Sequence, residues 1–246
     1  MSRAPYRLKD DPYSSHSLIL SRLGEGYGRR ALDVGAADGY LAERLTAAGW
    51  KVTALERDPA QAARAAAHCE QALVVDLERD SPALAGAYDA IVYGDVVEHL
   101  SNPLHVLRQL NRHLAPGGVV VVSVPNVAHL WVRLSLLVGR FDYGERGILD
   151  RTHLAFFTRR TFLSFLTAAG LASREMAVTP VPLPAVVPEG FHRPTLAAVH
   201  RLSAGAARLW PGGLAYQFVA VCAPARGGVG AWRHGRDRRP RRRSSW

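Results

Sequence analysis

Cysteine is scarce in this chain of 246 residues, which contains only Cys69 and Cys222, each in an apolar stretch. Two cysteines so far apart in the sequence offer neither a metal-binding spacing nor a disulfide framework. We therefore expect no metal site and a reducing compartment, the cytoplasm. The chain begins without a charged and then apolar leader, so no secretory signal is expected. The longest apolar stretch, residues 119–138, is interrupted by His129 and Arg133 and is too polar to cross a bilayer.

Lysine is also rare, with two lysines against 29 arginines. The formal net charge of +10 is concentrated at one end: residues 226–246 contain eight arginines and one acid and carry +7, which leaves +3 for residues 1–225. Most residues of this tail are arginine, glycine or serine, with little to bury, so it is expected to be disordered. Contact with nucleic acid or with an anionic membrane surface is one interpretation of the charge. We favour a solvated extension without a specific partner.

The Gly-x-Gly-x-x-Gly spacing of dinucleotide-binding turns is missing from the segment that most resembles one. That segment reads Asp33-x-Gly35-x-x-x-Gly39 and lies between an apolar run and a helical pattern. The glycines let the backbone approach a ligand without interference from a Cβ atom, and the free N–H groups of the new helix point into the same crevice. A pyrophosphate is best bound where no carboxylate faces it. Asp33 instead suits a ligand with positive charge, such as an ammonium or a sulfonium.

Four further apolar runs follow and are predicted to be strands. Three of these runs end in an acid, namely Glu56, Asp76 and Asp95. Because the carboxyl ends of parallel strands meet at one edge of a sheet, these acids are expected to lie together, with Glu56 placed to accept both hydroxyls of a ribose. The alternation of strands and helices indicates an α/β fold with right-handed crossovers. The predicted strands are 51–56, 71–76, 88–95 and 117–124, and the predicted helices are 40–48, 59–69 and 103–114.

This ordered series resembles the core of class I S-adenosylmethionine-dependent methyltransferases. The matching motifs, within residues 30–126, are LDVGAADG, ALERDP, VVDLE, YDAIVYGDVVEHL and LAPGGVVVVSVPN. The resemblance implies a doubly wound Rossmann-like sheet, mostly parallel with an antiparallel edge strand and helices on both faces. It also implies S-adenosylmethionine as cofactor, with the residues after the third run flanking its adenine ring. The donor-binding residues that it implies are Asp33, Gly35, Ala36, Gly39, Glu56, Arg57, Asp76, Leu77, Gly94 and Asp95.

The C-terminal half departs from this alternation. Residues 127–138 are predicted to form a helix with apolar positions on more than one side, and therefore a well-covered one. Thr158 is predicted to cap a helix over residues 159–169. Residues 171–179 and 216–222 are predicted to be the last two strands, an antiparallel pair at one edge of the sheet.

The expected organisation has three parts. Residues 1–29 form an N-terminal helical extension, residues 30–225 a methyltransferase domain, and residues 226–246 the arginine-rich tail. Within the domain, residues 127–158 and 180–213 are predicted to cover the substrate as a lid or to line its pocket.

Methyl transfer from a sulfonium is an in-line displacement, in which the protein mainly aligns nucleophile, methyl carbon and sulfur. An oxygen nucleophile must also lose a proton, so a base is expected. His153 is the first candidate because it follows the loop 139–150 and precedes two phenylalanines that can anchor it; alternatively, it only hydrogen-bonds the lid to the core. His99 is the second candidate, although the resemblance implies that it lines the donor pocket. Arg151 is the candidate for holding an anionic or hydroxyl-rich substrate.

Residues 139–162, GRFDYGERGILDRTHLAFFTRRTF, also resemble bacterial methyltransferases of glycan and lipid-linked sugar pathways. This second resemblance implies a small-molecule acceptor that carries a hydroxyl, such as a sugar or a lipid-linked compound. Two other functions are considered: a non-catalytic protein that binds S-adenosylmethionine, and a nucleotide-binding oxidoreductase. The missing glycine spacing argues against the oxidoreductase.

Overall fold

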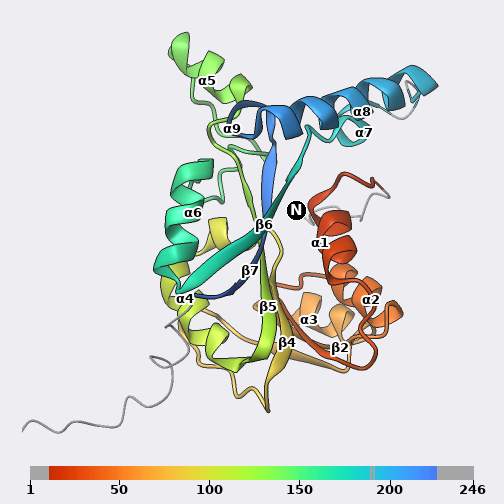
Figure 1. Cartoon of the computed structure of the whole chain (residues 1–246), viewed down its shortest axis with the longest axis vertical. Coiled ribbons are helices and arrows are strands. Elements are labelled where there is room, and N and C mark those ends of the chain that lie inside the picture. The colour runs from red at the N-terminus through yellow and green to blue at the C-terminus, as the bar shows by residue number, and fades with distance from the viewer. Residues whose placement is uncertain (1–10, 189, 191, 226–246) are drawn as a thin grey trace, which may run out of the picture.

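The computed structural model describes residues 11–188, 190 and 192–225, which form a seven-stranded sheet flanked by helices (Figure 1). The predicted arginine-rich tail and residues 1–10 of the predicted extension lie outside the described residues. The spatial order of the strands is β3-β2-β1-β4-β5-β7-β6. In chain order they are β1 (Arg30–Val34), β2 (Lys51–Glu56), β3 (Gln71–Val74), β4 (Tyr88–Tyr93), β5 (Leu114–Pro125), β6 (Leu171–Thr179) and β7 (Gln217–Pro224).

The first five strands are parallel, and β7 is antiparallel to both of its neighbours, β5 and β6. From β1, the chain order runs outward to β2 and β3 on one side and to β4 and β5 on the other. A reversal of this kind places a ligand-binding crevice at the carboxyl ends of β1 and β4. The prediction of a doubly wound, mostly parallel sheet with an antiparallel pair at one edge is confirmed.

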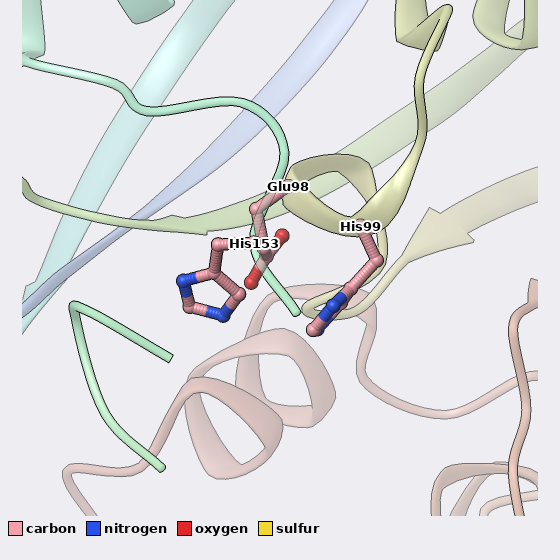
Figure 2. Close-up of side chains that lie close together, drawn as sticks. All are labelled: Glu98, His99 and His153. Atoms are coloured by element: carbon pink, nitrogen blue, oxygen red, sulfur yellow. The ribbon is translucent and has the colours of Figure 1, made fainter. Parts of the chain in front are cut away.

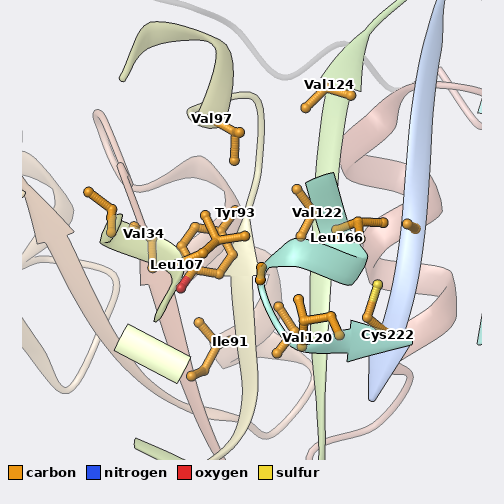
Figure 3. Packing of buried hydrophobic residues seen from close by; sticks show 14 of the residues in the cluster. Val34, Ile91, Tyr93, Val97, Leu107, Val120, Val122, Val124, Leu166 and Cys222 are labelled. Carbon is orange, nitrogen blue, oxygen red and sulfur yellow. The ribbon is translucent and has the colours of Figure 1, made fainter. Parts of the chain in front are cut away.

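Helices cover both faces of the sheet because successive side chains of each strand point to opposite faces. On one face, Leu107 and Leu166 pack against Ile91, Tyr93 and Val122 (Figure 3). On the other face the buried strand residues are smaller and contact the N-terminal helices. The first face is covered by α4 (Pro103–Leu110) and α6 (Arg159–Ala168), and the second by α1 (Ser15–Leu23), α2 (Tyr40–Ala47) and α3 (Pro59–Ala65).

Short polar side chains start several of these helices. The Asp58 carboxylate accepts the N–H of Ala60 at the start of α3. Thr158 and Thr161 form a reciprocal capping box at the start of α6, as the sequence predicts for Thr158. Gly170, with φ +76°, follows the end of that helix.

Helix α5 (Leu130–Leu137) is less covered than its sequence predicts. Val132 is buried, whereas Trp131 is 72% exposed and Leu137 is 81% exposed. The prediction of a well-covered helix was therefore wrong. The sequence shows only that apolar side chains lie on more than one side of the helix. In the fold, α5 projects beyond the body of the sheet, where no other described element lies against those sides (Figure 1).

The remaining helical elements lie outside the alternating core. None of the described helices is both long and apolar enough to span a membrane. Helices α8 and α9 lie at the same end of the molecule as α5 (Figure 1). The helical elements outside the alternating core are the 3₁₀ turns η1 (Val97–His99) and η2 (Asn111–His113) and the helices α7 (Leu183–Val186), α8 (Pro194–Leu209) and α9 (Pro211–Leu214).

Candidate active site

The loop between β1 and α2 contains two glycines in the left-handed region, Gly35 with φ +72° and Gly39 with φ +85°. A Cβ atom on Gly35 would lie 2.6 Å from Cγ2 of Val96, and one on Gly39 would lie 2.7 Å from Cα of Ala65. Ala36, between the two glycines, is buried. Packing is thus a second reason for these glycines, beside the predicted close approach of a ligand. A side chain would collide with the loop after β4 or with α3.

Asp33, near the end of β1, is 2% exposed, and its Oδ2 atom has no hydrogen-bond partner among the described residues. Burial and the charge of Glu56 raise the pKa of the Asp33 carboxyl to about 7, against a smaller lowering by the N–H of Ala42. A buried carboxyl oxygen without a partner is costly, and a cationic ligand group would compensate it. The position thus suits the ammonium or sulfonium that the sequence suggests.

Glu56 ties the loop after β1 to the loop after β2. Its Oε2 atom accepts the N–H of Ala37 at 2.9 Å, and its Oε1 atom accepts the N–H groups of Arg57 at 2.8 Å and Asp58 at 2.9 Å. A carboxylate has about four acceptor positions, so capacity for a ligand hydroxyl remains. Arg57 contributes its backbone here, and its side chain is exposed.

The loop after β3 carries Asp76 and Leu77. The Asp76 carboxylate accepts the N–H of Glu78 at 3.1 Å, and Leu77 packs against the main core cluster. Glu78 in turn accepts the N–H of Ser101 at 2.6 Å, which joins this loop to the one after β4. Asp76 and Leu77 therefore lie on a loop that is fastened to the same edge of the sheet.

Asp95, which follows Gly94 at the end of β4, has φ +55° and is held from two sides. Its carboxylate accepts the hydroxyl of Ser15 at 2.8 Å and that of Ser123 at 2.5 Å. His16 lies near Gly94, the residue before Asp95, since a Cβ atom on Gly94 would be 3.9 Å from the His16 ring. Burial lowers the pKa of His16, and the Asp95 charge opposes that shift. Sequence reasoning missed both Ser15 and His16, because nothing in the pattern of α1 indicates which helix residues reach the end of β4.

A carboxylate and two imidazoles meet beyond β4: Glu98 and His99 on η1, and His153 on the segment between α5 and α6. One potential ligand atom from each lies within 4.8 Å of the others. The Glu98 carboxylate lies between the two rings in the view of Figure 2, and the ring centroids are 4.8 Å apart. Glu98 is 1% exposed, and its Oε2 atom has no hydrogen-bond partner in the described part of the chain. Burial and the Asp95 charge raise the pKa of its carboxyl well above the usual value. Sequence reasoning named both histidines and missed Glu98, although it directly precedes His99.

Hydrogen bonds define the tautomers of the two histidines. His153 Nδ1 lies 3.0 Å from the carbonyl of Ile148, and His99 Nδ1 lies 3.2 Å from the carbonyl of Thr152. A carbonyl only accepts, so each Nδ1 carries a proton and each neutral ring keeps the lone pair on Nε2. The Thr152 hydroxyl, 3.1 Å from His99 Nδ1, donates to Asp150 at 2.7 Å. Burial lowers the pKa of His153 and so favours its neutral form.

The segment that carries His153 is fastened to η1. The N–H groups of Leu154 and Ala155 both donate to the Glu98 carbonyl, at 2.7 and 3.0 Å. Phe157 is buried in the main core cluster, which confirms that a phenylalanine anchors this segment. His153 is therefore held at the carboxyl edge of the sheet.

Arg151 lies at the surface of the same segment. Its side chain is 61% exposed, and Nη2 of its guanidinium lies 3.1 Å from a carboxylate oxygen of Glu145. The side chain stays largely exposed in this ion pair. Its contact with a substrate stays a prediction.

Comparison with known protein sequences matches this chain to a family. The sequence model of a family described as "Methyltransferase domain" matches residues 11–175. The ubiquinone biosynthesis O-methyltransferase of Sodalis glossinidius is 34% identical over 114 residues, 44% of this chain and 46% of that protein. The protein of the same name from Nitrosococcus oceani is 36% identical over 105 residues, 40% of this chain and 44% of that protein. The chain thus spans about half the length of the curated relatives that it matches.

Solved structures share the fold at low sequence identity. An S-adenosylmethionine-dependent methyltransferase from Archaeoglobus fulgidus superposes with a TM-score of 0.57 at 15% identity, over 85% of this chain and 94% of that one. The N-methyltransferase NodS of Bradyrhizobium japonicum, in complex with S-adenosyl-L-homocysteine, gives 0.56 at 19% identity, over 89% and 91%. At these identities the likeness shows the fold alone.

Proposed function

The chain belongs to the methyltransferase-domain family, whose sequence model matches residues 11–175, and we propose that it transfers a methyl group from S-adenosylmethionine to a hydroxyl oxygen of a small molecule. The observation that carries the proposal is the arrangement at one edge of the sheet. Asp33 and Glu56 lie at the carboxyl ends of the neighbouring strands β1 and β2, and the cluster of Glu98, His99 and His153 lies beyond β4, the strand on the other side of β1.

The donor side of this arrangement suits a cationic nucleoside. The Oδ2 atom of Asp33, which has no hydrogen-bond partner within the described ranges, would face positive charge, and the remaining acceptor capacity of Glu56 would take ribose hydroxyls. Asp76 and Leu77 would flank the adenine, and Gly94 and Asp95 would close the pocket from β4. The complex of NodS with S-adenosyl-L-homocysteine supports this choice of donor at the level of the fold.

The acceptor side suits an oxygen nucleophile. In the proposed reaction the acceptor oxygen bonds to the methyl carbon, the carbon–sulfur bond breaks, and S-adenosylhomocysteine leaves with the bonding electron pair. The hydroxyl proton must also be removed, and the cluster of Glu98, His99 and His153 would promote its removal. In the simplest version the Nε2 lone pair of His153 takes this proton. The name of the curated relatives, O-methyltransferases, supports an oxygen acceptor.

Methyl transfer from S-adenosylmethionine with a labelled methyl group tests the proposal. The full chain is incubated with phenolic, sugar and lipid-linked hydroxyl compounds, and with amines and thiols as competing classes. We expect label in at least one hydroxyl compound, together with an equal amount of S-adenosylhomocysteine.

Binding experiments separate the other two functions. Tight binding of S-adenosylmethionine without transfer to any acceptor would favour a non-catalytic binding protein. Binding of NAD in preference to S-adenosylmethionine would favour an oxidoreductase and contradict the proposal.

A further inference from the structure

We propose that Glu98, His99 and His153 bind one divalent transition-metal ion, which holds the oxygen of the acceptor next to the methyl donor. Sequence analysis predicted no metal because the two cysteines offer no ligand spacing. The three proposed ligands instead come from η1 and from a segment more than 50 residues later, and only the fold brings them together. The role of the ion rests on the proposed function, but its binding does not.

The carboxyl of Glu98 is buried without a compensating cation among the described residues. The side chain is 1% exposed, and its Oε2 atom has no hydrogen-bond partner among the described residues. Neither a lysine nor an arginine forms an ion pair with it among those residues. Proteins rarely bury a carboxylate without a partner, because the desolvation is uncompensated unless it is paired or binds a metal. A cation bound between the side chains would compensate the ionised form of this carboxyl.

The two histidines are oriented as metal ligands usually are. Metal-binding imidazoles usually donate their second N–H group to a carbonyl or a carboxylate, which fixes the tautomer and the ring. His153 does so to the carbonyl of Ile148, and His99 does so to the carbonyl of Thr152. The Thr152 hydroxyl is in turn oriented by Asp150. Both Nε2 lone pairs are left free for a metal.

The spacing and the exposure of the three side chains also suit a metal ion. Ligands at about 2.0–2.2 Å from a tetrahedral metal lie roughly 3.5 Å apart, so side chains whose ligand atoms now lie within 4.8 Å need to close by about 1 Å. Glu98 and His153 are buried, whereas His99 is exposed. The site would thus have three protein ligands and one side open to the substrate, as catalytic metal sites do.

The donor set indicates the class of metal. Two imidazoles and one carboxylate favour zinc, manganese or iron over magnesium and calcium, which prefer oxygen ligands. A metal-bound hydroxyl loses its proton more readily than a free one, as the fall in the pKa of metal-bound water shows. The proton would pass to solvent, and the metal-bound oxygen would then attack the methyl carbon. His153 would act as a ligand in this version of the mechanism.

Binding of Mn²⁺ to the full chain tests the proposal without any acceptor. Purified protein is treated with a chelator, desalted and titrated with Mn²⁺, and the free ion is followed by electron paramagnetic resonance. We expect one tight site per chain, weakened at least 30-fold by Glu98→Gln and by His99→Gln. The matched control is His105→Gln, which removes an exposed imidazole from α4, outside the cluster, and is expected to keep the site.

Two further readouts make the outcome decisive. Co²⁺ should give visible absorption bands in the parent that Glu98→Gln lacks, and Mn²⁺ should raise the melting temperature of the parent but not of the variant. Circular dichroism establishes that the variants fold. Because His99→Gln alters an exposed side chain, this variant is expected to keep the fold. Failure of the parent to bind Mn²⁺, Co²⁺ or Zn²⁺, or equal binding by both ligand variants, would overturn the proposal. Methyl transfer at an unchanged rate in chelator would exclude the catalytic role of the ion and leave the proposed function standing.

Discussion

Asp33 is buried beside Glu56, and burial together with the Glu56 charge raises the pKa of the Asp33 carboxyl to about 7. Asp33 lies one residue before the end of β1, and Glu56 is the last residue of the neighbouring strand β2. The second acid thus makes ionisation of the first more costly. Positive charge on a bound donor would remove this cost, so folding, pH and donor binding are linked at one pair of residues.

Stability should depend on pH through Asp33. The carboxyl has a higher pKa in the folded state than its ordinary value of about 3.9, so the folded protein binds more protons between about pH 4 and pH 7. Its contribution to the free energy of unfolding therefore falls as pH rises through that window and stays low above it.

Asp33→Asn should remove this contribution. Denaturant unfolding of the ligand-free protein measures the free energy of unfolding of variant and parent. The value for the variant minus that for the parent should increase by about 1–3 kcal/mol from pH 5 to pH 8. The same variant should bind S-adenosylmethionine more weakly, because the carboxylate that faces its positive charge is gone. A parallel pH dependence in parent and variant would show that Asp33 does not titrate in this range.

Gly35→Ala tests why glycine occupies the loop after β1. The added Cβ atom meets Val96 at a positive φ, so we expect a loss of about 2–4 kcal/mol in the free energy of unfolding. Gly28→Ala is the matched control, because Gly28 has φ +78° and an added Cβ meets nothing within 4 Å. The control should lose about 1 kcal/mol.

A double-mutant cycle isolates the steric part of that effect. Gly35→Ala combined with Val96→Ala should recover about 1 kcal/mol or more relative to the sum of the single losses. Additive losses would mean that the backbone conformation alone, and not contact with Val96, requires glycine.

His153→Ala should lower the turnover of methyl transfer about 10²–10⁴-fold, because it removes the ring that takes the acceptor proton or, with a metal bound, one of the ligands of the ion that promotes loss of this proton. The affinity for S-adenosylmethionine should stay within about threefold, since His153 lies on the acceptor side of the edge. Arg151→Ala should mainly raise the Michaelis constant of an anionic or hydroxyl-rich acceptor. The control is His105→Ala, an exposed histidine of α4. Full turnover of His153→Ala across pH 6–9 would exclude a role for this residue in deprotonation.

Removal of residues 226–246 should leave both melting temperature and donor affinity unchanged. These residues lie outside the described part of the chain, and the expectation comes from their composition alone. A role in nucleic-acid binding would appear as salt-dependent binding by the full chain that the truncated chain lacks. A truncated chain that failed to fold would contradict the prediction.

The alternating part of the fold was predictable because its signals are local. Glycine turns, short apolar runs and acids at strand ends each lie within a few residues, and they indicated the parallel strands and the edge where they meet. The exposure of α5 was not predictable, because an apolar pattern does not say which element lies opposite. The meeting of Glu98 with His153 depends on hydrogen bonds from Leu154 and Ala155 to the Glu98 carbonyl, which no local pattern shows. The contact of Ser15 with Asp95 likewise depends on where α1 packs.

Calorimetric titration with S-adenosylhomocysteine, which binds without turnover, tests the donor site most directly. The parent should bind this product, and Glu56→Gln should weaken binding about 10-fold or more through loss of charged hydrogen bonds to the ribose. Glu70→Gln, an exposed acid at the opposite edge before β3, should bind like the parent, and melting curves should show that both variants fold. Equal affinity in all three proteins would contradict the account, because the donor would then bind away from the carboxyl edge of β1 and β2.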